Sequence, residues 1–196
     1  MDADSENMLA IRRVSENERE LVHLFLQELA NHQRKISDAY AARYTEHTVD
    51  DWTEACCDEL ASRHGWAAVA ELDDRPVGFI KLGLDDGIGS IDDLVVLPEA
   101  RGQGVGSQLM DWARREFSQR GIREVELTVS EGNGMALAFY ERHGFRTATR
   151  TMRLVDIARH IDGPFQGRRA PSTKNRRNRE KDIGRFADPI PADLIA

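Results

Sequence analysis

The chain is poor in the residues that build disulfide-rich or membrane-spanning proteins. Its 196 residues include only two cysteines, Cys56 and Cys57, and these are adjacent, which is unsuited to a disulfide framework. No apolar run approaches the roughly 20 residues of a membrane-spanning helix. The first residues, Met1 to Ser5, are acidic and polar, unlike a secretory signal. We therefore expect reduced thiols, a cytoplasmic location and no membrane segment.

What is present fits one folded domain followed by a basic tail. Hydrophobic residues make up 40% of the chain, enough for the core of one domain of this length. Between 159 and 185, nine Lys and Arg stand against three Asp and Glu, a composition typical of disordered or loosely docked segments. We expect a flexible N-terminus over 1–7, the domain over 8–154 and the tail over 155–196. The tail is either solvated without a partner or a binder of nucleic acid, a phosphate group or an acidic surface.

Hydrophobic periodicity predicts alternating strands and helices. Strands are expected over 8–13, 66–72, 76–84, 90–97, 123–130 and 145–154. Helices are expected over 15–36, 50–63, 105–121 and 133–144, the first beginning with a capping box of Ser15 and Glu18. Crossover helices on such strands predict a single mixed α/β domain with a largely antiparallel central sheet flanked by helices.

The most informative stretch is the run Arg101-Gly102-Gln103-Gly104-Val105-Gly106-Ser107, which follows an apolar strand and opens an amphipathic helix. Glycines let a backbone turn and approach a ligand without a Cβ clash, and a helix N-terminus favours an anion. The run therefore predicts a phosphate or pyrophosphate site. It lacks the Lys of a Walker loop and the third glycine of a dinucleotide fingerprint, so alone it also fits an ordinary strand-to-helix turn.

A second segment, from Asn133 to Phe145, is typical of a short helix that begins at an Asn cap and ends at a glycine. Together the two segments resemble the GCN5-related N-acetyltransferase (GNAT) family, whose enzymes use acetyl-CoA. The first family pattern, Gln/Arg-x-x-Gly-x-Gly/Ala, is met by Arg101, Gly104 and Gly106. The second, Asn-x-x-Ala-x-x-Leu/Phe-Tyr-x-x-x-Gly-Phe, is met by Asn133, Ala136, Phe139, Tyr140, Gly144 and Phe145. The resemblance covers 8–154 in layout and 90–145 most firmly, and it implies a GNAT-like fold.

The resemblance also implies a site for acetyl-CoA and no metal. The strand that carries Leu94, Val95 and Val96 is expected to splay from the next strand, so that its free backbone groups hold the pantetheine arm and the acetyl carbonyl. The pyrophosphate is expected on the N–H groups of the glycine run, from Arg101 through Gly106, together with Ser107. Asn133 is expected to contact the cofactor.

Acetyl transfer to an amine requires a neutral amine, donors for the oxyanion and a proton for the departing sulfur. The resemblance implies Tyr140 beside that sulfur as general acid, because a phenol is protonated near pH 7; the alternative is a core aromatic. Asp92 matches the Glu of a Glu-Asp pair in relatives such as polyamine acetyltransferases and is the first candidate base, acting through a water. Adjacent strand residues alternate, so Asp92 and Asp93 are expected on opposite faces. The alternatives are exposed carboxylates without a role, another base or none; the other candidates are Glu71, Glu126 and Glu131.

The acceptor is indicated only by charge. Residues 16–60, which in this family roof the acceptor site, carry eleven Asp and Glu against four Lys and Arg. This favours a cationic amine such as a polyamine, an aminoglycoside, a lysine side chain or a peptide N-terminus, although it also fits a solvated face of an acidic protein. The histidines of this region lack metal-ligand spacing and are expected to be surface or packing residues: His23, His32 and His47. A non-catalytic acyl-CoA sensor, or an interaction scaffold with a basic tail, remains the alternative function, and a homodimer remains open.

Overall fold

The computed structural model describes residues 8–36, 46–62 and 64–152. Its contacts divide the chain into two units, and every helix and strand that it describes lies in the unit that contains residues 8–146. Residues 147–152 belong to the other unit and form neither helix nor strand. The predicted flexible N-terminus over 1–7 and the basic tail over 155–196 lie outside the described residues.

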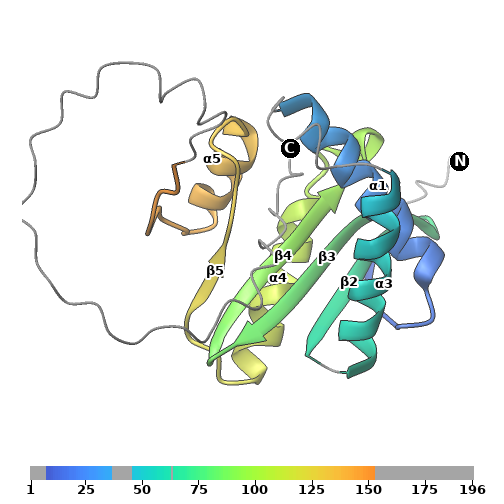
Figure 1. Ribbon diagram of the computed structural model, residues 1–196, viewed down its shortest axis with the longest axis horizontal. Coiled ribbons are helices and arrows are strands. Elements are labelled where there is room, and N and C mark those ends of the chain that lie inside the picture. Colours follow the sequence, from blue (N-terminus) through green and yellow to red (C-terminus); the bar gives the residue numbers. More distant parts are fainter. Residues whose placement is uncertain (1–7, 37–45, 63, 153–196) are drawn as a thin grey trace, which may run out of the picture. The chain divides into compact units, whose positions relative to one another are not determined.

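A five-stranded sheet forms the centre of the first unit, in the order β1-β2-β3-β4-β5 (Figure 1). Neighbours from β1 to β4 are antiparallel, whereas β5 is parallel to β4. The strands are β1 (Leu9–Val14), β2 (Gly65–Leu72), β3 (Arg75–Asp85), β4 (Ile88–Val96) and β5 (Val125–Leu127). The helices are α1 (Arg19–Ile36), α3 (Glu46–Ser62), α4 (Val105–Gln119) and α5 (Gly134–Arg142), with a short 3-10 helix η1 (Pro98–Ala100). The predicted mixed α/β fold with a largely antiparallel sheet is confirmed.

Helices cover both faces of this sheet because its inner strands alternate apolar side chains between two cores. On β2, Ala67 and Val69 pack in the core beneath α1 and α3, whereas Ala68 and Ala70 pack in the core beneath α4 and α5. Figure 1 shows the same division, with α1 and α3 on one face of the sheet and α4 on the other. The central strands are thus held from both sides, which makes them a rigid base for a site.

A β-bulge interrupts β4. The register pairs Lys81 of β3 with Asp93 and Leu82 with Ile91, so Asp92 is an extra residue without a partner on β3. Cross-strand partners share a face, which puts Asp93 on the face of Lys81, and the Lys81 ammonium contacts Asp92 as well. The expectation that the two aspartates point to opposite faces is therefore wrong, because the bulge breaks the alternation on which it rested.

The sheet opens between β4 and β5. These strands pair only over Gly89–Ile91 and Val125–Leu127. From Asp92 onward, the edge of β4 that faces β5 pairs with no described strand, and the two ribbons diverge (Figure 1). The splay expected beside Leu94, Val95 and Val96 is present.

Two predicted strands differ from the structure. The strand expected over 123–130 is restricted to Val125–Leu127, and the described part of the strand expected over 145–154 is not a strand. The reason at Phe145 is local: its N–H donates to the Tyr140 carbonyl and Gly144 adopts a φ of 89°. The two residues therefore complete the C-terminal cap of α5 instead of starting a new strand.

Candidate active site

The glycine run forms the N-terminus of α4. Gly102 and Gly104 have φ angles of 73° and 81°, in the left-handed region that favours glycine. Gly104 is the N-cap of α4, and no side chain within the described part of the chain caps it by a hydrogen bond. The N–H groups of the first turn are therefore left to a ligand, and the helix dipole favours an anion there. This is the geometry that a phosphate group requires.

The side chains of this loop turn toward the protein. Arg101 donates from Nε to the Val96 carbonyl at 3.0 Å, and its Nη2 lies 3.4 Å from Glu28 Oε1 of α1. Gln103 donates to the Glu99 carbonyl at 2.8 Å. The loop is thus fixed by its side chains, and the groups left to bind an anion are backbone N–H groups.

Backbone groups of β4 face the splay. The Leu97 N–H donates to the Val77 carbonyl of β3 at 2.8 Å, so its backbone points away from β5. Backbone groups of successive strand residues point to opposite edges, so those of Val96 and Leu94 point toward the splay, and those of Val95 toward β3. Arg101 covers the carbonyl of Val96. This edge can offer hydrogen bonds to an extended ligand, much as a further strand would.

Asn133 joins the start of α5 to α1. Its Oδ1 accepts a hydrogen bond from the Ala136 N–H at 3.1 Å, which makes it the N-cap of α5, and its Nδ2 lies 3.4 Å from His32 Nε2. Burial lowers the pKa of His32, and the nearby charges of Arg101 and Lys35 lower it further, so the ring is neutral at pH 7 and accepts from Asn133. Asn133, expected to contact the cofactor, is 4% exposed and holds these elements together.

Tyr140 lies in the core beneath α4 and is 2% exposed. Its ring packs edge-on between Phe139 and Phe145, with centroid distances of 5.5 Å and 5.7 Å. Further along the same face, Ser107 Oγ of α4 lies 3.3 Å from His143 Nε2 and ties the end of α5 to the glycine loop. The tyrosine is therefore held in one orientation by rigid neighbours.

Asp92 lies on the other face of the sheet, toward α3. Its Oδ1 accepts from Ser90 Oγ at 2.6 Å and its Oδ2 from Lys81 Nζ at 2.9 Å. Tyr140 packs beneath α4, so the two candidate catalytic residues make no contact, and a molecule that reaches both must pass through the splay. Of the other candidate bases, Glu71 is paired with Arg12 at 2.9 Å. Glu126 is the β5 partner of Ser90 and stays a candidate, as does the exposed Glu131.

The two thiols are poorly placed to act as nucleophiles. Cys56 is buried, and burial raises its pKa to about 12. Burial also raises the pKa of Cys57. Because the thiolate is the reactive form, neither side chain is suited to covalent catalysis at neutral pH.

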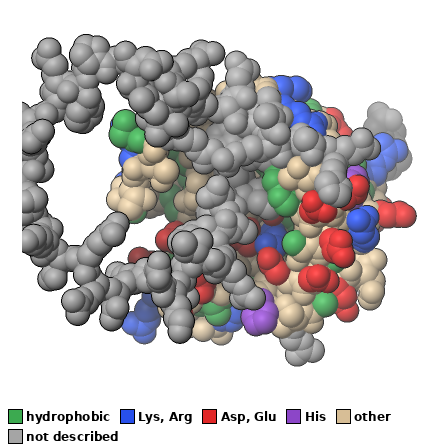
Figure 2. Space-filling model, viewed as in Figure 1, with side chains coloured by type: hydrophobic (Ala, Val, Ile, Leu, Met, Phe, Trp, Pro, Cys, Tyr) green, Lys and Arg blue, Asp and Glu red, His purple; other side chains and the backbone are tan. Residues whose placement is uncertain are grey.

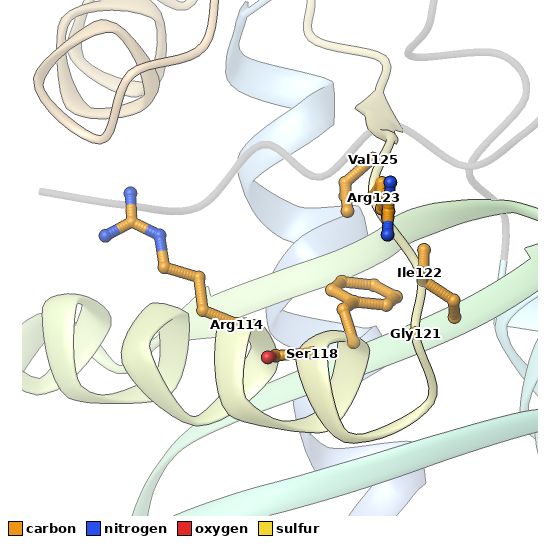
Figure 3. Close-up of a pocket in the computed structure, with 7 residues that line it drawn as sticks. Arg114, Ser118, Gly121, Ile122, Arg123 and Val125 are labelled. Carbon is orange, nitrogen blue, oxygen red and sulfur yellow. The ribbon is translucent and has the colours of Figure 1, made fainter.

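Two cavities lie along α4, and neither is lined by a residue of the glycine run. One of about 400 Å³ is lined by residues at the C-terminal end of α4 and in the turn to β5 (Figure 3), namely Arg114, Phe117, Ser118, Gly121, Ile122, Arg123 and Val125. A second, of about 330 Å³, shares Arg114, Phe117, Arg123 and Val125 with it. Neither is lined by a residue predicted to bind the cofactor or to catalyse, but the second also reaches Ile91, at the last pair of β4 with β5, and Gly144 and Phe145 of the second family pattern.

The acidic character predicted for this region is concentrated on α3, whereas α1 carries two Glu against three Lys and Arg. The segment of α3 contains six Asp and Glu and no Lys or Arg. Figure 2 shows acidic side chains gathered over the part of the molecule where α1 and α3 lie. Among the described helices, none is both long and apolar enough to cross a bilayer.

Curated proteins similar to this chain include N-acetyltransferases. An aminoalkylphosphonate N-acetyltransferase of Salmonella typhimurium is 46% identical over 59 residues, which is 30% of this chain and 38% of that protein. The chain thus matches less than half the length of this relative.

Solved structures share the fold. The PaiA N-acetyltransferase of Thermoplasma acidophilum, in complex with coenzyme A, aligns over 71% of this chain and 90% of its own with a TM-score of 0.58 and 22% identity. The aminoglycoside N-acetyltransferase AAC(6')-Iy, in complex with a bisubstrate analogue, aligns over 76% and 98% with a TM-score of 0.60 and 21% identity. The model of the acetyltransferase (GNAT) family matches residues 26–145, more than half of the chain. With its splayed sheet and uncapped glycine loop, the chain belongs to the GNAT acetyltransferase family.

Proposed function

We propose that the protein is an acetyl-CoA-dependent N-acetyltransferase whose acceptor is a cationic primary amine. The observation that carries this proposal is the junction of two features at one place: the open edge of β4 leads directly to the uncapped, glycine-led N-terminus of α4. An extended chain that ends in a pyrophosphate is the ligand that uses both. Coenzyme A has this shape, and it is bound in the structure of the PaiA relative.

On the donor side, the backbone does the binding. The first-turn N–H groups of α4, from Val105 through Ser107, hold the pyrophosphate, with Gly102 and Gly104 allowing its close approach. Leu94 and Val96 direct backbone groups toward the pantetheine arm, and Val95 holds the strand to β3. The Asn133 cap and its contact with His32 fix the far side of the splay. The residues present therefore fit the acyl donor.

In the transfer step, the amine attacks the thioester carbonyl and the thiolate leaves with a proton from Tyr140. The phenol is suited to this because it is neutral at pH 7 and its ring is fixed between Phe139 and Phe145. Its burial keeps bulk water from competing for the proton transfer. Removing a general acid of this kind costs about 10²- to 10⁴-fold in rate.

On the acceptor side, Asp92 orients the amine and receives its proton through a water. Two observations support a cationic acceptor: the carboxylate lies beside the splay on the α3 side, and α3 carries six acidic and no basic residues. A cation is drawn toward such a surface by long-range attraction. The relatives named for aminoalkylphosphonates and aminoglycosides also act on molecules that carry amino groups.

The test is turnover with a defined donor and a panel of acceptors. Purified protein is titrated with acetyl-CoA in a calorimeter and then assayed by thiol release with spermidine, neamine and a lysine-containing peptide. We expect about one binding site per chain and release of CoA with at least one of these amines. Acetyl-CoA binding without turnover would favour a sensor, and no binding by the folded protein would leave an interaction scaffold as the better account.

Tyr140→Phe tests the acid. The change removes one oxygen from a tightly packed ring, so we expect the affinity for acetyl-CoA to be unchanged and kcat to fall at least about 100-fold. Phe139→Leu, on the same helix, is the control for disturbed packing without loss of an acid. Unchanged turnover in Tyr140→Phe would remove the tyrosine from the mechanism.

A further inference from the structure

Lys81 is a buried cation at the centre of β3. Its side chain is 8% exposed, and its Nζ lies 2.5 Å from Glu59 Oε2 and 2.9 Å from Asp92 Oδ2. The first partner comes from α3 and the second from the bulge of β4. A single ammonium therefore joins the helix layer to the sheet.

Three carboxylates surround this ammonium. Asp93 is the cross-strand partner of Lys81 and is 1% exposed, Asp92 precedes it in the bulge, and Glu59 faces both from α3. The other titratable group nearby is the Cys56 thiol of α3. Burial alone would lower the pKa of Lys81, but the three carboxylates outweigh burial and raise it. The ammonium thus stays charged at every pH at which the protein would work.

A glycine on β3 leaves space for the Ser90 and Asp92 side chains of this cluster. Gly83 of β3 is the register partner of Ser90, and a Cβ at Gly83 would lie 2.6 Å from Ser90 Oγ and 3.0 Å from Asp92 Oδ2. Any other residue would push the Ser90–Asp92 pair away, since real Cβ atoms do not approach so closely. Ser90 holds one oxygen of Asp92 and Lys81 holds the other, so the carboxylate has a single orientation.

The fixed Asp92 carboxylate lies at the point where β4 and β5 separate. Ile91 and Leu127 form the last pair between β4 and β5, and Asp92 is the next residue along β4. Its carboxylate is 22% exposed, so it is open to a ligand although both oxygens are held. Asp92 therefore stands at the mouth of the splay, where the acceptor amine meets the acyl donor in the proposed function.

We propose that Lys81 is a positioning residue for acetyl transfer: by binding Asp92 and Glu59 together, it fixes the carboxylate that faces the acceptor amine and holds α3 against the sheet beside the splay. This inference rests on the proposed function. It assigns a role to a residue that does not itself touch the amine, and it explains why a lysine stands in the buried part of an apolar strand. Without the ammonium, the Asp92 and Glu59 carboxylates would repel each other and Asp92 would lose its orientation.

The test compares Lys81→Met with three controls. Glu59→Gln removes only the α3 partner, Asp93→Asn removes only the buried carboxylate, and Ile80→Ala weakens the core on the opposite face. We expect Lys81→Met to lower kcat/KM for the amine by roughly 10- to 100-fold while the affinity for acetyl-CoA stays unchanged. We also expect the acidic limb of its pH–rate profile to move to higher pH, because carboxylates without a neighbouring cation protonate more readily. Ile80→Ala should leave that limb in place.

The outcomes separate the two proposals. If Lys81→Met turns over at the wild-type rate with the wild-type pH profile, the inference is overturned and the proposed function stands. The same holds if Lys81→Met loses rate without a shift of the acidic limb of its pH–rate profile and Ile80→Ala shows the same loss. Absence of wild-type turnover with every acceptor overturns the proposed function and the inference with it. Should Lys81→Met fail to fold, the double variant Lys81→Met/Asp93→Asn removes the buried carboxylate as well as its cation, and the same loss and shift are expected relative to Asp93→Asn.

Discussion

Asp93 makes folding stability depend on pH in a direction opposite to that of most carboxylates. It is 1% exposed, and its Oδ1 has no hydrogen-bond partner among the described residues. Burial raises its pKa from 3.8 to about 7, and the Lys81 ammonium only partly offsets this. Replacement by Asn keeps the shape of the side chain and removes the charge. Asp93→Asn should therefore gain stability relative to the wild type as the pH rises.

The sign follows from proton binding. Between pH 3.8 and about 7 the folded protein holds a proton on Asp93 that the unfolded chain has released, so the free energy of unfolding falls as the pH rises. Each pH unit in this window is worth ~1.4 kcal/mol, so the whole window is worth roughly 4 kcal/mol. About 3 kcal/mol of this falls between pH 5 and pH 8.5. Asn does not titrate and escapes this loss.

The assay is urea unfolding of both proteins at pH 5, 7 and 8.5, followed by circular dichroism. The difference in free energy of unfolding, Asp93→Asn minus wild type, should grow by about 3 kcal/mol from the lowest to the highest pH. Histidines titrate in both proteins and cancel from the difference. Asp85→Asn, at an exposed position of β3, is the control and should show no trend. A difference that does not change with pH would mean that Asp93 is ionised throughout, and the reasoning from burial would fail.

Two further predictions concern the glycine loop and the thiols. Gly104→Ala meets no atom within 4 Å but must hold a φ of 81°, so we expect a loss of ~1–2 kcal/mol in unfolding free energy and weaker acetyl-CoA binding. Gly134→Ala, in the first turn of α5 and equally free of clashes, should be neutral or stabilising; equal losses in both would contradict the argument from φ. With a thiol reagent at pH 8, Cys57 should react slowly in the folded protein and Cys56 only after denaturation, because burial raises the pKa of both thiols. Rapid reaction of Cys56 in the native state would contradict this argument from burial.

Much of the fold follows from short-range patterns. Ser15 and Glu18 make one of the two bonds of the expected capping box, with the Ser15 N–H donating to Glu18 Oε2 at 2.8 Å, whereas the Glu18 N–H donates to the Ser15 carbonyl. Helix α1 begins at the next residue. Asn133 caps α5 as its residue type indicates. Alternation fails at Asp92 because a bulge depends on the register with β3, and two adjacent aspartates carry no local sign of an extra residue. Strand β5 is shorter than its alternating sequence indicates, because it diverges from β4 after Leu127 and loses the partner that pairing requires.

For the candidate site, the sequence predicts the main-chain features but not the side-chain partners. The glycine run indicates the loop, and its positive φ angles agree, but nothing in the motif shows that Arg101 and Gln103 bind the protein's own carbonyls. His32, expected to be a surface or packing residue, is half-buried and packs against the Asn133 cap, a partner that the sequence does not indicate. Lys81 was missed, although a lone lysine in an apolar strand is a signal that could have found it. Its partners come from α3 and β4, and only the fold brings them together.

The bulge of β4 makes the length of this strand matter more than the identity of its residues. Ile91 and Leu94 pack in the same core although they are three positions apart, a spacing that would put them on opposite faces of an unbroken strand. Deletion of one residue between them would make the side chains of either the start or the end of β4 exchange faces of the sheet. Apolar side chains would leave their core and polar ones would enter it.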